Sequence, residues 1–150
     1  MPVFLEKDNS VSKSNIIIVD DEKSILSSLK RELIDEPYDL FFASNGQEAL
    51  KILSERPFKV ILSDVNMPGM DGFELLEKVK KLYPDIISVI FSGLSDVNLI
   101  LSIVNARQIE RYLMKPWSII DVKLTITQCI ELFDLRTDVA NLRKQLKKRS

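Results

Sequence analysis

The chain has 150 residues, of which 45% are apolar and 29% charged, and its formal net charge is -1. These values are typical of one globular domain with a buried core, and the charge gives no electrostatic basis for nucleic-acid binding. The chain has no histidine and one cysteine, Cys129, which excludes imidazole sites, a Ser-His nucleophile and thiolate metal clusters. No apolar stretch reaches the length of a membrane span, and the polar leader 1–14 lacks the features of a secretory signal, so we expect a cytoplasmic protein.

The first half of the chain predicts two strands and two helices. The β-branched run 16–19 is typical of a strand covered on both faces. Helical spacing follows as far as Pro37, with apolar residues at Ile25, Leu26, Leu29, Leu33 and Ile34. The segment 38–43 predicts the second strand and Asn45-Gly46 a turn. A second helix then continues until Pro57, with inward residues at Ala49, Leu50 and Leu53.

The second half of the chain repeats this alternation. The segment 59–64 predicts a buried third strand, and a helix before Tyr83-Pro84 is marked by Phe73, Leu75, Leu76 and Val79. The segment 86–92 predicts a fourth strand, 96–107 a fourth helix and 111–114 a short fifth strand. Five strands that alternate with five helices predict an α/β fold, a flavodoxin-like, doubly wound parallel sheet with the strand order 2-1-3-4-5.

Polar residues follow the carboxyl ends of four of these strands. Asp20 and Asp21 end the first strand, Asp64 the third, Ser92 the fourth and Lys115 the fifth. Ligands bind such sheets at this edge, so we expect these side chains to converge. Carboxylates brought together repel one another unless a cation lies among them, and oxygen ligands favour Mg²⁺. Asp64 could then attack a phosphoryl group, with Lys115 neutralising its oxygens and Ser92 donating a hydrogen bond to one of them.

Four motifs carry a resemblance to a known family: "IIIVDDEKSIL" at 16–26, "ILSDVNMPGMDGFELL" at 61–76, "VIFSG" at 89–93 and "YLMKPW" at 112–117. With these motifs the chain resembles the receiver domain of bacterial response regulators, the CheY-like superfamily of two-component systems. The resemblance implies that Asp64 accepts the phosphoryl group. It implies further that Asp21 binds Mg²⁺ directly, Asp20 through water and Asn66 through its backbone carbonyl.

The same resemblance implies a conformational switch and a phosphodonor. Ser92 would be the switch hydroxyl, Tyr112 the aromatic whose rotamer reports phosphorylation, and Lys115 the lysine that pairs with the phosphoryl group. Members of this family take the phosphoryl group from a histidine kinase or phosphotransfer protein and then control a downstream output. The chain would accordingly be a signalling domain rather than an enzyme, assisting only its own phosphotransfer and dephosphorylation.

Other interpretations of these residues remain open at this point. Asp20-Asp21 alone could be a helix N-cap with a favourable charge at the helix dipole. A receiver-like scaffold that works without phosphorylation is a second possibility. An aspartate-nucleophile phosphatase of the haloacid-dehalogenase type would need an acid/base Asp two residues after its nucleophile, whereas here the pair is adjacent. A flavodoxin-like cofactor binder would need a Ser-, Thr- and Gly-rich first loop, which "DDEKS" is not.

The last helix is predicted to continue beyond the receiver, which we place at residues 15–131. Its inward positions would include Ile119, Val122, Leu124, Ile126 and Ile130, and Cys129 would be a small core residue. In the extension 132–150, apolar residues spaced 3, 4, 3 and 4 apart form an a/d pattern at Leu132, Leu135, Val139, Leu142 and Leu146.

Charges beside this pattern favour a parallel homodimer. With Leu132 at position a, Glu131 and Asp138 occupy g positions, and Arg136 and Arg143 occupy e positions. Both g-to-e' pairs of a parallel dimer therefore join opposite charges, which predicts a short parallel coiled coil through 132–146. The alternative is that so short a pattern packs on its own domain or frays. Such a helix resembles one that joins a receiver to an effector, so either the chain is a single-domain regulator that acts through partners, or it belongs to a longer protein whose output domain lies beyond Ser150.

Overall fold

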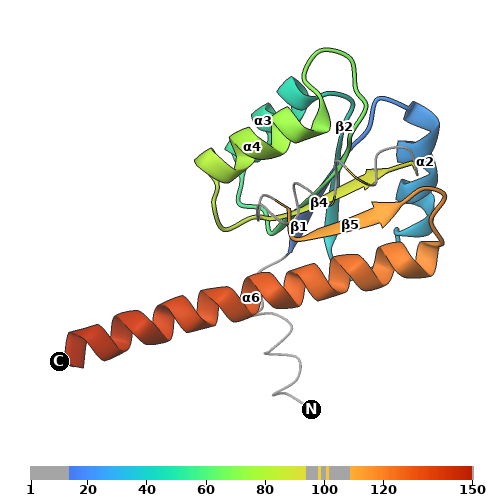
Figure 1. The fold of residues 1–150 in the computed structure, drawn as a ribbon. Helices are drawn as coiled ribbons and strands as arrows, with labels where there is room; N and C mark the ends of the chain where they lie inside the picture. The colour runs from blue at the N-terminus through green and yellow to red at the C-terminus, as the bar shows by residue number, and fades with distance from the viewer. Residues whose placement is uncertain (1–13, 94–97, 99–100, 102–108, 150) are drawn as a thin grey trace.

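The computed structural model describes residues 14–93, 98, 101 and 109–149 of the chain. Strands and helices alternate along it (Figure 1). The strands are β1 (Asn15–Val19), β2 (Asp39–Ala43), β3 (Val60–Asp64), β4 (Ile87–Ser92) and β5 (Arg111–Met114). The helices are α2 (Lys23–Glu32), α3 (Gly46–Glu55), α4 (Gly72–Leu82) and α6 (Ile119–Arg149). Of the helix predicted over 96–107, only Asn98 and Leu101 belong to the described residues, and both are helical.

All five strands form one parallel sheet in the order β2-β1-β3-β4-β5. The predicted fold class is therefore confirmed, with strand boundaries that differ from the expected ones by at most one residue. β1, β3 and β4 lie in the middle of the sheet and are buried along almost their whole length, as continuous apolar runs predict. Because every strand runs in the same direction, all five carboxyl ends lie at one edge, which we call the carboxyl edge, and the opposite one is the amino edge.

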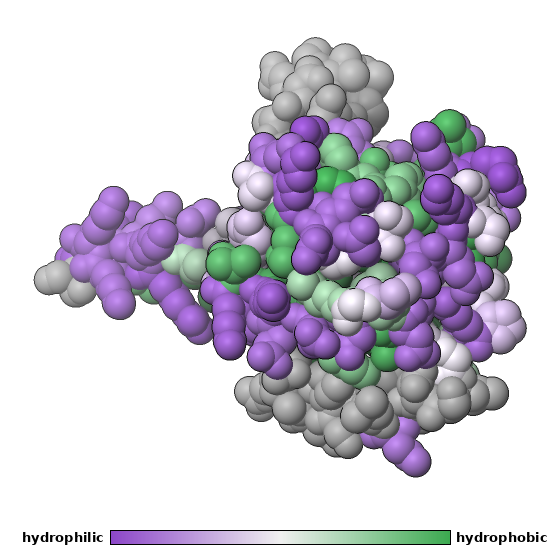
Figure 2. Space-filling model, turned by 90° about the horizontal axis from the view of Figure 1, so that it is seen from above, coloured by the Kyte–Doolittle hydropathy of each residue, from purple (hydrophilic) through white to green (hydrophobic). Residues whose placement is uncertain are grey.

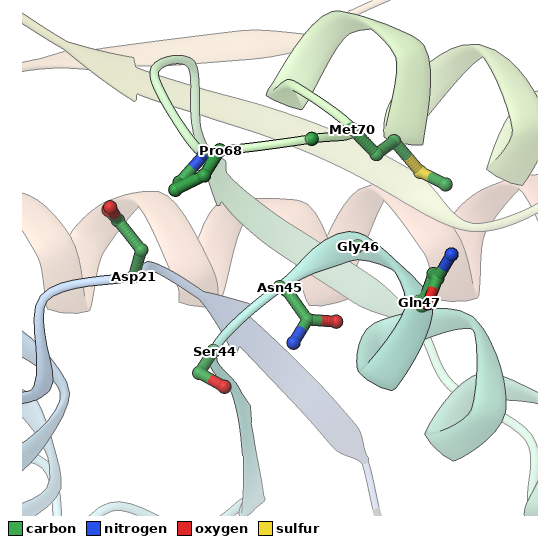
Figure 3. Close-up of a pocket in the computed structure, with 8 residues that line it drawn as sticks. Asp21, Ser44, Asn45, Gly46, Gln47, Pro68 and Met70 are labelled. Atoms are coloured by element: carbon green, nitrogen blue, oxygen red, sulfur yellow. The ribbon is translucent and has the colours of Figure 1, made fainter.

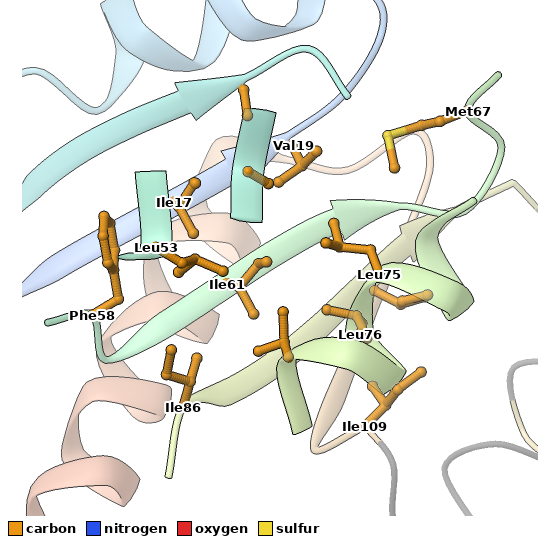
Figure 4. Close-up of a cluster of buried hydrophobic side chains, with 14 of the residues drawn as sticks. Ile17, Val19, Leu53, Phe58, Ile61, Met67, Leu75, Leu76, Ile86 and Ile109 are labelled. Atoms are coloured by element: carbon orange, nitrogen blue, oxygen red, sulfur yellow. The ribbon is translucent and has the colours of Figure 1, made fainter. Parts of the chain in front are cut away.

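Two apolar cores lie on the two faces of this sheet. On one face α3 and α4 pack against side chains such as Ile17, Ile61 and Ile90 (Figure 4). On the other face α2 and the first half of α6 cover Ile18, Leu62 and their neighbours. Alternate strand residues point to opposite faces, so each central strand contributes to both cores. The result is a rigid three-layer body that fixes the strand ends.

The turn predicted at Asn45-Gly46 is a bend between β2 and α3, where Asn45 caps α3 through a 2.8 Å hydrogen bond that its side chain accepts from the Glu48 N–H and Gly46 already begins the helix. Two local predictions are wrong. Ile34 is exposed, since α2 ends at Glu32, before the predicted spacing does. Leu124 is also exposed, because the buried face of α6 is narrow.

α6 is a single helix of 31 residues. It begins near the carboxyl edge after β5, runs back along the sheet and projects beyond the amino edge (Figure 1). Its buried side chains are Val122, Ile126 and the predicted core residue Cys129, at spacings of 4 and 3. No helix in the described part of the chain is apolar over a length that would cross a membrane.

Candidate functional site

The carboxyl edge brings together residues that lie far apart in the sequence. Asp20 follows β1, Asp64 is the last residue of β3, and Lys115 follows β5. The Lys115 Nζ lies 3.3 Å from Asp64 Oδ1 and 3.5 Å from Asp20 Oδ2. Carboxylate oxygens of Asp20, Asp21 and Asp64 all lie within 4.8 Å of one another. The convergence expected from the strand ends is thus present in the structure.

Asp20 is fully buried, and its two oxygens have different surroundings. Oδ1 accepts a 2.9 Å hydrogen bond from the Glu22 N–H, whereas Oδ2 has no hydrogen-bond partner among the described residues. Burial raises the pKa of Asp20 to about 6, although the Glu22 N–H and the Lys115 charge act in the opposite direction. The N-cap of α2 is Glu22, whose side chain makes no capping bond. Asp20 is therefore not the N-cap of α2: one of its oxygens accepts a backbone hydrogen bond, and the other lies 3.5 Å from the Lys115 ammonium without a hydrogen bond.

Asp64 is buried as well, and its side chain is held in a fixed direction. Its Oδ1 accepts a 2.9 Å hydrogen bond from the Val65 N–H. Burial raises the pKa of Asp64, and the neighbouring Lys115 lowers it. The chain returns closely past this strand end, because the Gly72 N–H donates to the Val65 carbonyl oxygen at 2.9 Å, and a Cβ on Gly72 would overlap the Asp64 carbonyl oxygen. Only glycine fits there, which explains the glycine that begins α4.

Lys115 is positioned by aromatic side chains on the same edge. Its Nζ lies 5.2 Å from the ring centre of Phe91 and 5.9 Å from that of Trp117. The two rings contact each other edge to face, with centroids 5.0 Å apart. The peptide bond between Lys115 and Pro116 is cis. The ammonium is therefore directed toward the carboxylates by packing as well as by charge.

The residues present fit a hard divalent cation. The three carboxylates lie close together and Lys115 pairs with two of them, Asp20 and Asp64, so the cluster carries an excess of negative charge when ionised. The buried Asp20 Oδ2 has the Lys115 ammonium 3.5 Å away but accepts no hydrogen bond among the described residues, so it has room for a further electrostatic partner. Oxygen ligands of this kind suit Mg²⁺. Asn66, two residues after Asp64, is exposed and engaged in contacts of its own.

Ser92 and Tyr112 lie on neighbouring strands. In the β4–β5 register Ser92 pairs with Met114 and Ile90 with Tyr112, so Ser92 and Tyr112 share one face of the sheet. Ser92 is buried, and its Oγ donates to the Gly93 carbonyl oxygen at 3.3 Å. Tyr112 is 37% exposed. The two side chains therefore differ in environment: Ser92 is buried, whereas Tyr112 lies at the surface.

A pocket beside Asp21 contains residues that sequence reasoning did not single out. Its volume is about 390 Å³, and it opens between the β2–α3 and β3–α4 connections (Figure 3). It is lined by Asp21, Ser44, Asn45, Gly46, Gln47, Pro68, Gly69 and Met70. Two hydrogen bonds fix one wall of this pocket. The Ser44 N–H donates to the Glu48 side chain, and the Glu48 N–H donates to the Asn45 side chain. Asn45 followed three residues later by Glu48 was a signal for this capped helix start.

Fold and site together define a doubly wound α/β domain with an acidic cluster at its carboxyl edge, and comparison with known proteins identifies the family. Residues 16–127 match the response regulator receiver domain model, so the chain belongs to the response regulator receiver domain family. Receiver domains are signalling domains of two-component systems rather than classical enzymes.

Individual relatives agree with this membership. The chain is 33% identical over 138 residues to the hydrogenase transcriptional regulatory protein HoxA of Cupriavidus necator, covering 92% of the chain and 28% of HoxA. The chain thus spans little more than a quarter of that relative. A crystal structure described as adenylate cyclase from Rhodopirellula baltica matches at a TM-score of 0.83 and 34% identity, covering 88% of this chain and 98% of that one. The crystal structure of a CheY-like response regulator receiver domain protein from Methanospirillum hungatei JF-1 matches at a TM-score of 0.76 and 31% identity. The match covers 83% of this chain and 99% of that one.

Proposed function

We propose that the chain accepts a phosphoryl group on Asp64 from a histidine kinase or phosphotransfer protein, in a Mg²⁺-dependent reaction of a two-component phosphorelay. The observation that carries this proposal is the meeting of three carboxylates with a single ammonium, 3.3 Å from Asp64, at the carboxyl edge. In this proposal the ligands of Mg²⁺ are Asp20, Asp21, Asp64 and the backbone carbonyl of Asn66. Bound there, Mg²⁺ supplies the positive charge that the carboxylates and a phosphoryl group require.

The chain's own residues then have separate tasks. An ionised oxygen of Asp64 attacks phosphorus, and the bond from phosphorus to the donor's leaving group breaks with its electron pair going to that group. Lys115 stabilises negative charge on the phosphoryl oxygens, because its ammonium already lies beside Asp64. The Val65 N–H donates a hydrogen bond to Asp64 Oδ1 and so keeps the attacking carboxylate in a fixed direction. Ser92 donates its hydroxyl to a phosphoryl oxygen once the group is attached.

Ser92 and Tyr112 are the proposed switch. When the Ser92 hydroxyl leaves the Gly93 carbonyl for the phosphoryl group, it frees space on the face that it shares with Tyr112. The tyrosine ring then turns from its partly exposed position toward the sheet, and the surface around β5 changes. This change would control a downstream output or partner of unknown identity.

We propose three parts for the chain. Residues 15–131 form the receiver, 1–14 a leader, and 132–150 a helical extension toward a possible output domain. We place the protein in the cytoplasm, where its phosphodonor would be. A scaffold that works without phosphorylation is the second candidate, and the experiment below separates it from the first.

The direct test is the intact mass of the whole chain after incubation with acetyl phosphate and Mg²⁺. We expect the addition of one phosphate to the wild type, and no addition to Asp64→Asn or in the presence of EDTA. Asp85→Asn is the matched control, because Asp85 is an exposed acid remote from the cluster, and it should be modified like the wild type. Wild-type protein that is never modified while remaining folded would contradict the proposal and favour the scaffold.

A further inference from the structure

The projecting half of α6 carries an exposed apolar stripe. Four of its residues are largely accessible: Leu135 at 61%, Val139 at 39%, Leu142 at 57% and Leu146 at 65%. Leu132, at the start of the same a/d pattern, instead packs partly against the core of its own domain. We use the name seam for the five positions Leu132, Leu135, Val139, Leu142 and Leu146. Large apolar side chains in one row on a surface mark an interaction site.

The seam and the domain-packing face of α6 are different faces of the helix. With 3.6 residues per turn, the exposed seam lies about 140° around the axis from Val122, Ile126 and Cys129. The face of the projecting helix that is visible in Figure 2 is mainly hydrophilic. The seam therefore points away from the receiver. A partner helix can cover the four exposed seam residues without displacing Val122, Ile126 or Cys129 from the sheet.

The receiver also holds the base of the projecting helix in a fixed direction. Lys59 Nζ lies 2.7 Å from Asp134 Oδ1, and Arg136 Nη1 lies 3.3 Å from Glu110 Oε1. Phe133 packs against the core and lies under Lys59 Nζ, 5.7 Å from it. Three neighbouring positions thus attach one side of α6 to the amino edge. Leu132 thus packs in part on its own domain, while the other four seam residues lie on a face of α6 that these attachments leave exposed.

We infer that the seam binds the seam of a second copy of this chain, in parallel, to form a homodimeric coiled coil. In this arrangement Asp138 at g faces Arg143 of the other copy at e, an attractive pair on each side. In an antiparallel pair, Asp138 would face Asp138 and Arg136 would face Arg143, which repel. The second pair expected from the sequence, Glu131 with Arg136, must compete with the Arg136–Glu110 contact.

A parallel dimer gives the two receivers a defined placement. α6 begins near the carboxyl edge and leaves the domain beyond the amino edge (Figure 1). Both carboxyl edges then lie at the end of the dimer opposite the coiled-coil tip. Each acidic cluster stays open to a phosphodonor, and none of its residues belongs to the seam, so the inference of a dimer does not rest on the proposed phosphorylation.

Sedimentation velocity of the unphosphorylated full chain over a wide concentration range tests the inference. We expect a monomer–dimer equilibrium, because two heptads give modest stability. Leu135→Glu with Leu142→Glu should raise the dissociation constant about tenfold or more. Thr137→Glu is the control, because Thr137 is exposed on the opposite side of the helix, and it should dimerise like the wild type. A monomer at every concentration, or a dimer that the double variant leaves unchanged, would overturn the inference.

A cysteine variant tests the orientation. Cys129 is buried, so a cysteine introduced at position 146 is the accessible thiol among the described residues. In a parallel dimer the two copies of Leu146→Cys meet and form a disulfide on mild oxidation, whereas Thr137→Cys does not. A dimer in which Leu146→Cys never crosslinks would overturn the parallel arrangement. Far-UV circular dichroism and denaturant titration of the same variants show that the receiver is folded, and they do so whether or not the chain accepts a phosphoryl group.

Discussion

At the carboxyl edge of the sheet three carboxylates lie together and two of them, Asp20 and Asp64, share the ammonium of Lys115, whereas at the amino edge Lys59 and Glu110 each contact an oppositely charged side chain of α6. Lys59 is nearly as buried as Asp64, so burial alone does not separate the two edges. The difference is in pairing. At the amino edge the number of charges of each sign is close to balanced, and at the carboxyl edge negative charge is in excess.

This difference indicates what each edge does. A charge paired inside the fold can contribute to stability, while a buried charge without a full set of partners costs free energy and persists where function requires it. The carboxyl edge thus has the features of a binding site, and the amino edge those of an attachment point for α6. Removing a buried acid at the carboxyl edge should therefore raise stability in the absence of Mg²⁺, whereas removing a paired acid at the amino edge should lower it.

The largest effect is expected from Gly72→Ala, which removes the space that lets the chain pass the end of β3. The new methyl group would overlap the backbone of Asp64 and Val65, so the free energy of unfolding should fall by about 3 kcal/mol, measured by denaturant titration. Phosphate uptake should fall with it. Gly93→Ala is the control, since a Cβ there meets no atom within 4 Å among the described residues, and it should change stability by less than about 0.5 kcal/mol.

A smaller effect of opposite sign is expected from Asp20→Asn at the carboxyl edge. At pH 7 without Mg²⁺, this change removes a buried charge and should raise the free energy of unfolding by about 1 to 3 kcal/mol. The pKa of Asp20 is raised to about 6 in the folded state, so above that pH the buried carboxylate is ionised and lowers the free energy of unfolding. This loss of stability disappears as the pH falls from about 6 toward 3.8, the ordinary pKa of an aspartate, which applies to the unfolded chain. Denaturant titrations at pH 7 and pH 5 should thus show a gain that shrinks at the lower pH, and a loss of stability at pH 7 would contradict this account.

The smallest effect is expected at the amino edge, from Asp134→Asn. Lys59 would lose its 2.7 Å partner while its side chain remains 10% exposed, so stability should fall by about 1 kcal/mol. Asp85→Asn changes an exposed acid at the same edge and should have an effect near zero. Equal effects of the two substitutions would show that the Lys59–Asp134 contact does not stabilise the fold.

The sequence predicted most of the carboxyl edge because strand ends are readable from local patterns. Continuous apolar runs located β1, β3 and β4, and parallel topology then places Asp20, Asp64 and the region of Lys115 side by side. The roles of Ser92, Tyr112 and Asn66 came from the family resemblance and stay predictions.

The amino edge was not predicted, because its contacts join residues far apart in the chain. Nothing local pairs Lys59 with Asp134 or Glu110 with Arg136. Helical periodicity also misplaced Leu124, because an apolar residue at the right spacing can face solvent when no second layer covers it. Arg136 shows the same limit: its position in the heptad suggested a partner in another chain, and the fold supplies one in the same chain.

The central claim is that the excess negative charge at the carboxyl edge is there to bind a divalent cation. The most direct measurement is the free energy of unfolding at pH 7 as a function of Mg²⁺ concentration, for the wild type and Asp64→Asn. The account predicts that Mg²⁺ stabilises the wild type increasingly with concentration, as expected for a ligand of the folded state, and stabilises the variant much less. A wild type indifferent to Mg²⁺, or a variant stabilised equally, would contradict it.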